Sequence, residues 1–246
     1  MNKKPHMLIG AAALGISSLA MATDYSFELG GSWFDLEYGS AWGTDFTWHF
    51  DPVRSGRGPL EQAGFLNRSS NLRLDYLRDT DGDFHAVAGT LELYLEGFYV
   101  GAGASRFSNG FDIDSYSLRG GWMTGPNTRV TGNWDRIEAP FGSDIDIFSV
   151  GVKHVQLLGG GTAFHIDTEL GAATNGDTEV AYALRADYYP MPEFGFGLRT
   201  FGIGSDNDYG FGARYFFTPQ ISGEFEWLRH DATSDDTVQF RLGARF

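Results

Sequence analysis

The chain has 246 residues with 18 basic and 32 acidic side chains, a formal net charge of −14, and no cysteine. The lack of cysteine excludes a disulfide framework and a thiolate metal site, and the acidic balance argues against nucleic-acid binding, which needs clustered Lys and Arg. Glycine (34 residues) and aromatic residues (21 Phe, 11 Tyr, 6 Trp) are abundant, a combination typical of membrane β-barrels with interfacial aromatic belts.

Residues 1–22 have the features of a secretory signal peptide. Two lysines follow the initiator methionine closely, an apolar stretch runs from Met7 to Leu14, and Ala20–Ala22 is a small-x-small cleavage site. We therefore expect export, cleavage before Thr23 and a mature domain of residues 23–246. After residue 22 no apolar run is long enough for a spanning helix, so membrane insertion would require a closed barrel.

Apolar and polar side chains alternate with a period of two along most of the chain. Successive side chains of a strand point to opposite faces, so this pattern predicts strands with one apolar and one polar face. Residues 238–246, which end on Phe246, are the clearest example. The pattern predicts about 14 strands, with about 12 as the alternative because the second and third strands are the weakest. The predicted strands start near Tyr25, Thr44, Ser70, Phe84, Gly97, Ile113, Thr128, Ile145, Thr162, Glu179, Phe194, Tyr209, Ile221 and Thr237.

Two kinds of turn separate these segments. One kind is rich in acids, Gly and Asn, as at residues 79–83 and 204–208, and the other is tight and often contains Pro, as at residues 124–127 and 190–193. From residue 108 onward the two kinds largely alternate, as expected for hairpins with one set of turns on each side of a membrane. The predicted fold is an all-β, antiparallel, up-and-down transmembrane β-barrel with both termini in the periplasm.

The stretch Pro52–Ser69 breaks the strand pattern. It is a long connection in which a single helical turn can start at Pro59, since Pro is favoured at the first helical position. In the predicted register this connection lies at the periplasmic end of the barrel. We expect it to cover the barrel base, and the alternative is an inward fold that constricts the lumen.

Several motifs resemble those of the general bacterial porin family. These are Phe50–Val53, the stretch Pro59–Leu66 ahead of a strand, Phe98–Gly103 and Tyr209–Pro219. The resemblance covers essentially the whole mature chain. It implies passive diffusion through an outer-membrane barrel, without catalytic residues and without a defined substrate.

Polar side chains fall on the inward face of the predicted barrel. A dry interior would not tolerate so many ionisable groups, so the lumen is expected to be water-filled or salt-bridged, and about 14 strands favour an open channel. Six arginines from six strands would form a basic wall opposite Glu92, Glu224 and Glu226 and narrow the pore there. The alternative is a set of ordinary cross-strand pairs that hold the wall together. The candidate pore-lining residues are Glu92, Arg119, Arg129, Arg185, Asp187, Arg199, Arg214, Glu224, Glu226 and Arg241.

The outer turns are acidic and would bias the mouth toward cations. Asp79, Asp81 and Asp83 resemble the start of a calcium loop, but the remaining ligands are missing from the sequence. A tight hairpin tip at Asp81-Gly82 explains the same residues. No metal site and no cofactor are therefore expected.

An enzymatic barrel is the competing class of function. Ser149 and His154 lie on one predicted strand but on opposite faces, and the sequence contains neither a Gly-x-Ser-x-Gly elbow nor a His-Glu-x-x-His motif. We therefore expect no enzyme. Two further alternatives are a channel selective for acidic oligosaccharides and a closed structural or adhesive barrel.

The resulting prediction is an outer-membrane porin that passes small hydrophilic solutes and ions. Its expected partners are outer-membrane lipid, lipopolysaccharide and the barrel-insertion machinery, and nucleic acid is not expected among them. A homo-oligomer is left open.

Overall fold

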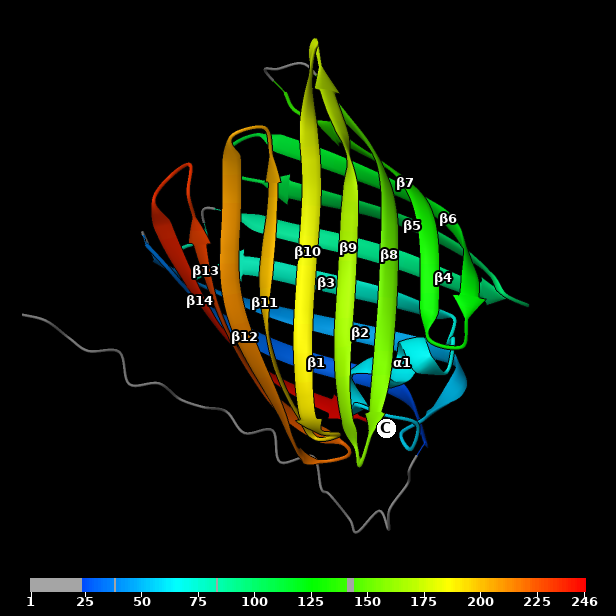
Figure 1. Ribbon diagram of the computed structural model, residues 1–246. Coiled ribbons are helices and arrows are strands. Elements are labelled where there is room, and N and C mark those ends of the chain that lie inside the picture. Colours follow the sequence, from blue (N-terminus) through cyan, green and yellow to red (C-terminus); the bar gives the residue numbers. More distant parts are fainter. Residues whose placement is uncertain (1–23, 38, 83, 141–143) are drawn as a thin grey trace, which may run out of the picture.

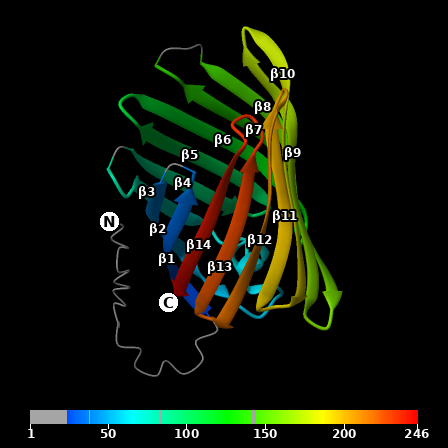
Figure 2. The same ribbon diagram turned by 90° about the vertical axis from the view of Figure 1, so that its left-hand side faces the viewer.

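The computed structural model describes residues 24–37, 39–82, 84–140 and 144–246. Within these residues fourteen strands form a closed barrel in which each strand pairs antiparallel with its sequence neighbours and β1 pairs with β14 (Figures 1 and 2). This confirms the all-β class and the prediction of about 14 strands, and it excludes 12. The strands are β1 (Asp24–Leu36), β2 (Gly39–Arg54), β3 (Asn71–Asp79), β4 (His85–Leu95), β5 (Phe98–Ser108), β6 (Asp112–Gly125), β7 (Thr128–Glu138), β8 (Ile145–Gly159), β9 (Thr162–Asn175), β10 (Asp177–Met191), β11 (Phe194–Ile203), β12 (Asp206–Thr218), β13 (Ile221–His230) and β14 (Asp235–Arg245).

The predicted signal peptide, residues 1–22, lies outside the described residues. In the described part of the chain, no helix is both long enough and apolar enough to cross a membrane.

The outer face of the barrel is apolar, as the period-two pattern predicts. Leu170, Leu198 and Leu242 expose 64%, 68% and 66% of their surface, and aromatic rings from adjacent strands pack together on this face, as Phe225 and Phe240 do at 5.3 Å between centroids. A contiguous apolar belt of this kind is unfavourable in water and favourable in a bilayer. The opposite, inward face carries charged side chains such as Arg185, Glu224 and Arg241.

The seam between β1 and β14 closes the barrel at the last residue of the chain. The amide of Phe246 donates to the carbonyl of Phe27 at 3.0 Å, and the Phe246 carbonyl accepts from the amides of Ser26 and Phe27 at 2.6 and 2.9 Å. No sheet edge remains along this seam, so its backbone groups are satisfied without water.

Two sequence predictions near the N-terminus are wrong in detail. The period-two pattern puts Tyr25 on the outer face together with Phe27 and Leu29. Tyr25 is instead 5% exposed and packs inward against Val53, because a bulge shifts the β1–β2 register between Tyr25 and Phe27. β2 starts at Gly39 rather than Thr44. Its first inward positions are the small residues Ala41 and Gly43, so polarity does not alternate visibly there.

Residues 55–70 connect β2 to β3 and are called the plug segment below. They contain the 3-10 turn η1 (Leu60–Gln62) and the short helix α1 (Ala63–Leu66), and they lie at the end of the barrel that holds the C-terminus (Figures 1 and 2). The Leu60 amide donates to the Pro192 carbonyl at 2.9 Å. Arg68 donates to the Gly125 carbonyl at 3.1 Å. The segment is therefore attached to turns on different parts of the rim.

Apolar side chains hold the plug segment against the inner wall. Phe65 and Leu66 cluster with Val155 of β8, and Tyr94 and Met123 pack against this cluster. Burying each large apolar side chain contributes roughly 1.5–3 kcal/mol. The expectation that this segment merely covers the barrel base is thus wrong, because its side chains are packed inside the barrel end.

Candidate functional site

The structure places all ten candidate pore-lining residues on the inner face of the barrel wall. They do not form one group, because the strand positions that carry them are spread around the circumference and along the barrel axis. Arg185, Asp187, Arg214, Glu224 and Arg241 meet in one network near the plug segment. The other five belong to separate pairs and clusters.

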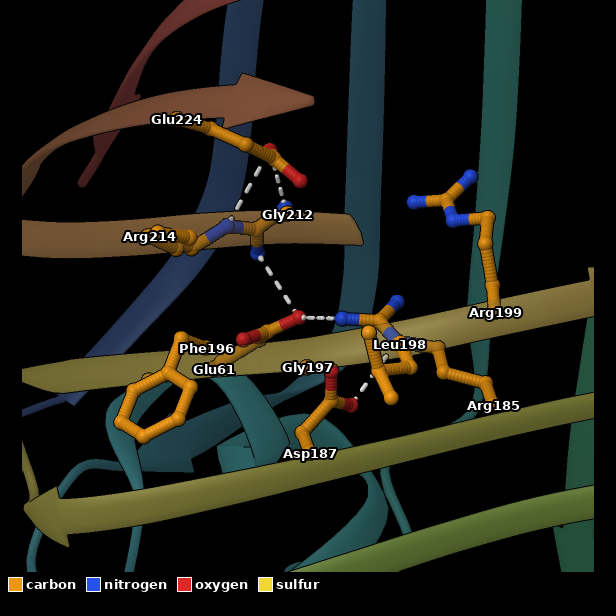
Figure 3. A pocket seen from close by; sticks show the side chains of 12 residues that line it. Glu61, Arg185, Asp187, Phe196, Gly197, Leu198, Arg199, Gly212, Arg214 and Glu224 are labelled. Carbon is orange, nitrogen blue, oxygen red and sulfur yellow. Dashed lines mark hydrogen bonds and ion pairs between the residues drawn. The ribbon is translucent and has the colours of Figure 1, made fainter. Parts of the chain in front are cut away.

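Glu61, on η1 of the plug segment, lies at the centre of that network (Figure 3). Its Oε1 atom is 2.5 Å from Nη2 of Arg185 and 3.7 Å from Nη1 of Arg214. The hydroxyl of Tyr189 donates to Oε2 at 3.2 Å. Three side chains from β10 and β12 therefore converge on one carboxylate that is not part of the barrel wall.

Each of the two arginines also has a carboxylate partner on the wall. Nε of Arg185 lies 2.8 Å from Oδ2 of Asp187, and Arg214 forms an ion pair with Glu224, which faces it across the β12–β13 pair. Arg241 extends the network, because its Nη1 is 3.8 Å from Glu224 Oε2. The network, whose part from Asp187 to Glu224 is drawn in Figure 3, thus alternates positive and negative groups.

The charge state of Glu61 follows from these neighbours. Burial alone would raise the pKa of its carboxyl group, but the positive charges of Arg214 and Arg185 outweigh burial and lower the pKa to about 2. Glu61 is therefore ionised across the neutral pH range. The positive potential at this point in the lumen favours a carboxylate despite the loss of water.

A second cluster surrounds Arg129 on β7. Its guanidinium carbon is 3.8 Å from the ring centroid of Tyr99, and its Nη1 donates to the Tyr94 hydroxyl at 2.9 Å and to Glu92 at 3.3 Å. The Tyr99 hydroxyl in turn donates to Glu92 at 2.6 Å. The cluster adjoins the plug segment, because Arg129 also lies 5.9 Å from the ring centroid of Phe65.

The remaining candidates form pairs elsewhere on the wall. Arg119 lies 3.8 Å from Glu169 and 4.0 Å from Asp135, and Arg199 forms an ion pair with Glu226. The predicted basic wall opposite an acidic wall is therefore wrong, since every arginine of that set has a carboxylate within 4.0 Å. Burying a charge without a partner costs more free energy than pairing it locally.

Sequence reasoning missed Glu61 and Asp45. Glu61 lies in a segment without periodicity, so no register could assign it a direction. One signal was present, because Glu61 is the single acidic residue between Asp51 and Asp75. Asp45 lies inward on β2 and pairs with Arg241 at 2.6 Å, and the weak alternation at the start of β2 obscured it.

Cavities extend from the Glu61 network along the lumen. One of about 310 Å³ is bordered by Glu61, Arg214 and Arg241. A second of about 300 Å³ shares Asp45, Arg73, Gln239 and Arg241 with the first, so the two adjoin. A third, of about 400 Å³, carries the carboxylates Asp135, Glu169, Asp206 and Asp208. Among the described residues no group of His, Cys, Asp and Glu could hold a metal ion.

Comparison with known proteins agrees with this architecture. The sequence model of a family described as "putative general bacterial porin" matches residues 3–157, more than half of the chain. The chain belongs to this porin family. No curated protein sequence matches it.

Solved porin structures share the fold. The outer membrane protein Omp33 of Acinetobacter baumannii superposes with a TM-score of 0.75 at 24% identity, covering 92% of this chain and 100% of Omp33. The KdgM porin in complex with disordered oligogalacturonate gives 0.50 at 9% identity, covering 89% of this chain and 99% of KdgM. A mutant of the Rh. blastica porin gives 0.50 at 9%, covering 90% and 99%. The family and this fold are those of outer-membrane channels rather than enzymes.

Proposed function

We propose that this porin lets small hydrophilic solutes and ions diffuse passively through a water-filled lumen in the outer membrane. The carrying observation is the inner wall, where ionisable side chains border adjoining cavities of about 310 and 300 Å³. Ionisable groups are stable at such positions when water reaches them. Fourteen strands enclose more room than the eight-stranded barrels that side chains fill completely.

The plug segment sets an upper limit on solute size in this proposal. It carries Phe65 and Leu66 into one end of the barrel, where both are less than 10% exposed. The proposal further includes cleavage of residues 1–22 on export, a periplasmic location of the plug segment, delivery by the barrel-insertion machinery, and contact with outer-membrane lipid and lipopolysaccharide.

Single-channel recording in a planar bilayer tests the proposal directly. Purified full-length protein should give stepwise conductance in KCl. Liposomes that contain it should swell in isotonic glycine or a pentose faster than in a trisaccharide, because the lumen is narrowed at the plug segment. Absence of both conductance and swelling would support a closed structural or adhesive barrel instead.

A channel selective for acidic oligosaccharides is the second candidate. It is favoured by the six lumenal arginines and by the shared fold with the KdgM porin, whose solved complex holds oligogalacturonate. Swelling rates separate the two functions. A general porin admits neutral and acidic disaccharides at similar rates, whereas the selective channel admits the acidic one faster.

A further inference from the structure

The groups around Glu61 have the composition of a carboxylate-binding site. Arg185 and Arg214 come from different strands, and Tyr189 adds a neutral donor that is 1% exposed. Guanidinium groups bind carboxylates through short, charge-assisted hydrogen bonds. In this structure the bound carboxylate belongs to the chain itself, and it reaches the site from the plug segment rather than from the wall (Figure 3).

The attachment of the plug segment does not depend on Glu61 alone. Arg245 donates to the carbonyl of Leu60 at 2.9 Å, Gln62 donates to the Tyr189 hydroxyl at 3.0 Å, and Phe65 and Leu66 are packed against β8. These contacts flank Glu61 on both sides. The acidic side chain can therefore be removed while the rest of the segment stays docked.

The site is open to the lumen. Glu61 and Arg214 both border the cavity of about 310 Å³, so a small solute in that cavity can reach the carboxylate and one guanidinium. The positive potential that keeps the pKa of Glu61 at about 2 would act equally on a free carboxylate at the same place.

We propose that Arg185, Arg214 and Tyr189 form a binding site for a small organic carboxylate, which Glu61 occupies as an intramolecular competitor. The tether gives Glu61 an effective concentration in the millimolar range or above, so free carboxylate competes poorly in the wild-type protein. Removal of the Glu61 carboxylate exposes the site. Access of an anion to this site by permeation rests on the proposed porin function, whereas binding of the anion at the site does not.

Thermal unfolding of the full-length protein in detergent measures binding without conductance. In Glu61→Ala the side-chain space is empty, and sodium acetate at about 100 mM should raise Tm by about 3–5 °C over sodium chloride of equal ionic strength, if its Kd is about 10 mM. Acetamide, a neutral molecule of the same shape, should have no effect. The wild type should not respond, because its site is occupied.

Two further variants test whether the stabilisation by acetate arises at this site. Glu61→Gln fills the same space with a neutral amide, so acetate should stabilise it much less than Glu61→Ala. Glu193→Ala removes an exposed acid from the β10–β11 turn and should behave as the wild type. Equal stabilisation of all variants by acetate, or no stabilisation of Glu61→Ala, would overturn the proposal.

Single-channel recording then separates this proposal from the porin function. Acetate that binds at the site should reduce the Glu61→Ala current in a concentration-dependent manner and leave the Glu193→Ala current unchanged. If Tm responds as expected but no variant conducts, the carboxylate site stands and the porin function fails. If the variants conduct but neither Tm nor current responds to acetate, the porin function stands and the site fails.

Discussion

The guanidinium group of Arg129 lies over the ring of Tyr99, with its central carbon 3.8 Å from the ring centroid. The same guanidinium donates to Glu92, which also accepts from the Tyr99 hydroxyl at 2.6 Å. Arg129 thus contacts the face of an aromatic ring and pairs with a carboxylate at the place where the plug segment meets the wall. This geometry suits the planar guanidinium and not a compact ammonium group.

Arg129→Leu should destabilise the barrel by about 2–3 kcal/mol, because Glu92 loses its charged partner in a mostly buried position. Arg129→Lys keeps the charge, and its free energy of unfolding should fall by about 1 kcal/mol because the contact with the Tyr99 ring is weaker. Denaturant unfolding in detergent or lipid vesicles measures both values. Arg106→Leu, which removes an exposed arginine paired with Asp114, is the control and should unfold as the wild type does. Equal stability of all three variants would contradict this account.

Arg214→Ala and Arg199→Ala should differ in their effect on the channel. Arg214 contacts both Glu61 and Glu224, whereas Arg199 pairs with Glu226 on the neighbouring part of the wall. Arg214→Ala therefore weakens the attachment of the plug segment, costs about 2–3 kcal/mol of stability, and should increase both mean conductance and its fluctuations. Arg199→Ala should leave the fluctuations unchanged. A larger effect of Arg199→Ala would contradict the contribution of the Arg214–Glu61 contact to this attachment.

The plug segment should stay docked in moderately acidic solution. The pKa of Glu61 falls from its ordinary value of 4.5 to about 2 in the folded protein, so the ionised form is favoured by docking. The contribution of the ionised Glu61 carboxylate to the stability of the docked segment is fully present above pH 4.5 and is lost as the pH falls through about 2. Single-channel conductance should therefore be constant between pH 7 and pH 4.5 and change only below that range. Glu61→Gln, which lacks the group, should show no such transition, and a wild-type transition centred near pH 4.5 would contradict the assignment.

Acidic side chains around the cavity of about 400 Å³ should favour cations. Asp135 and Asp206 both border it, and rings of carboxylates set the ion preference of cation channels. The double variant Asp135→Asn, Asp206→Asn should reduce the potassium-to-chloride permeability ratio by roughly a factor of two, taken from the reversal potential in a KCl gradient. Glu193→Gln, at the opposite end, is the control for loss of an acidic charge away from this cavity. A ratio that rises in the double variant would show that other groups set the preference.

Strand number and most strand starts could be predicted because the barrel wall follows a strict period of two. The predicted starts Thr128, Ile145, Thr162, Phe194 and Ile221 coincide with those of the structure. The pattern holds for these strands because each separates lipid from lumen along its whole length. It failed at Tyr25, where a bulge changes the phase and a local pattern cannot reveal the shift.

The candidate site was predictable only where it belongs to the wall. The inward direction of Arg185, Arg214 and Glu224 follows from strand register, but their meeting point depends on how far neighbouring strands are staggered around a closed barrel. Glu61 required knowledge of where an irregular segment of the chain would dock. That docking is decided by contacts with residues more than 120 positions away, such as Arg185 and Tyr189.

The attachments of the plug segment also impose an order on assembly. The segment follows the second strand in the chain, yet its partners lie on β8, β10, β12 and β14. It can reach its final position only after those strands are in place, and β14 is the last of these four to be made. The lumen should therefore be widest during insertion and narrow as the final step, so a chain stalled before β14 pairs with β1 would leave the membrane leaky.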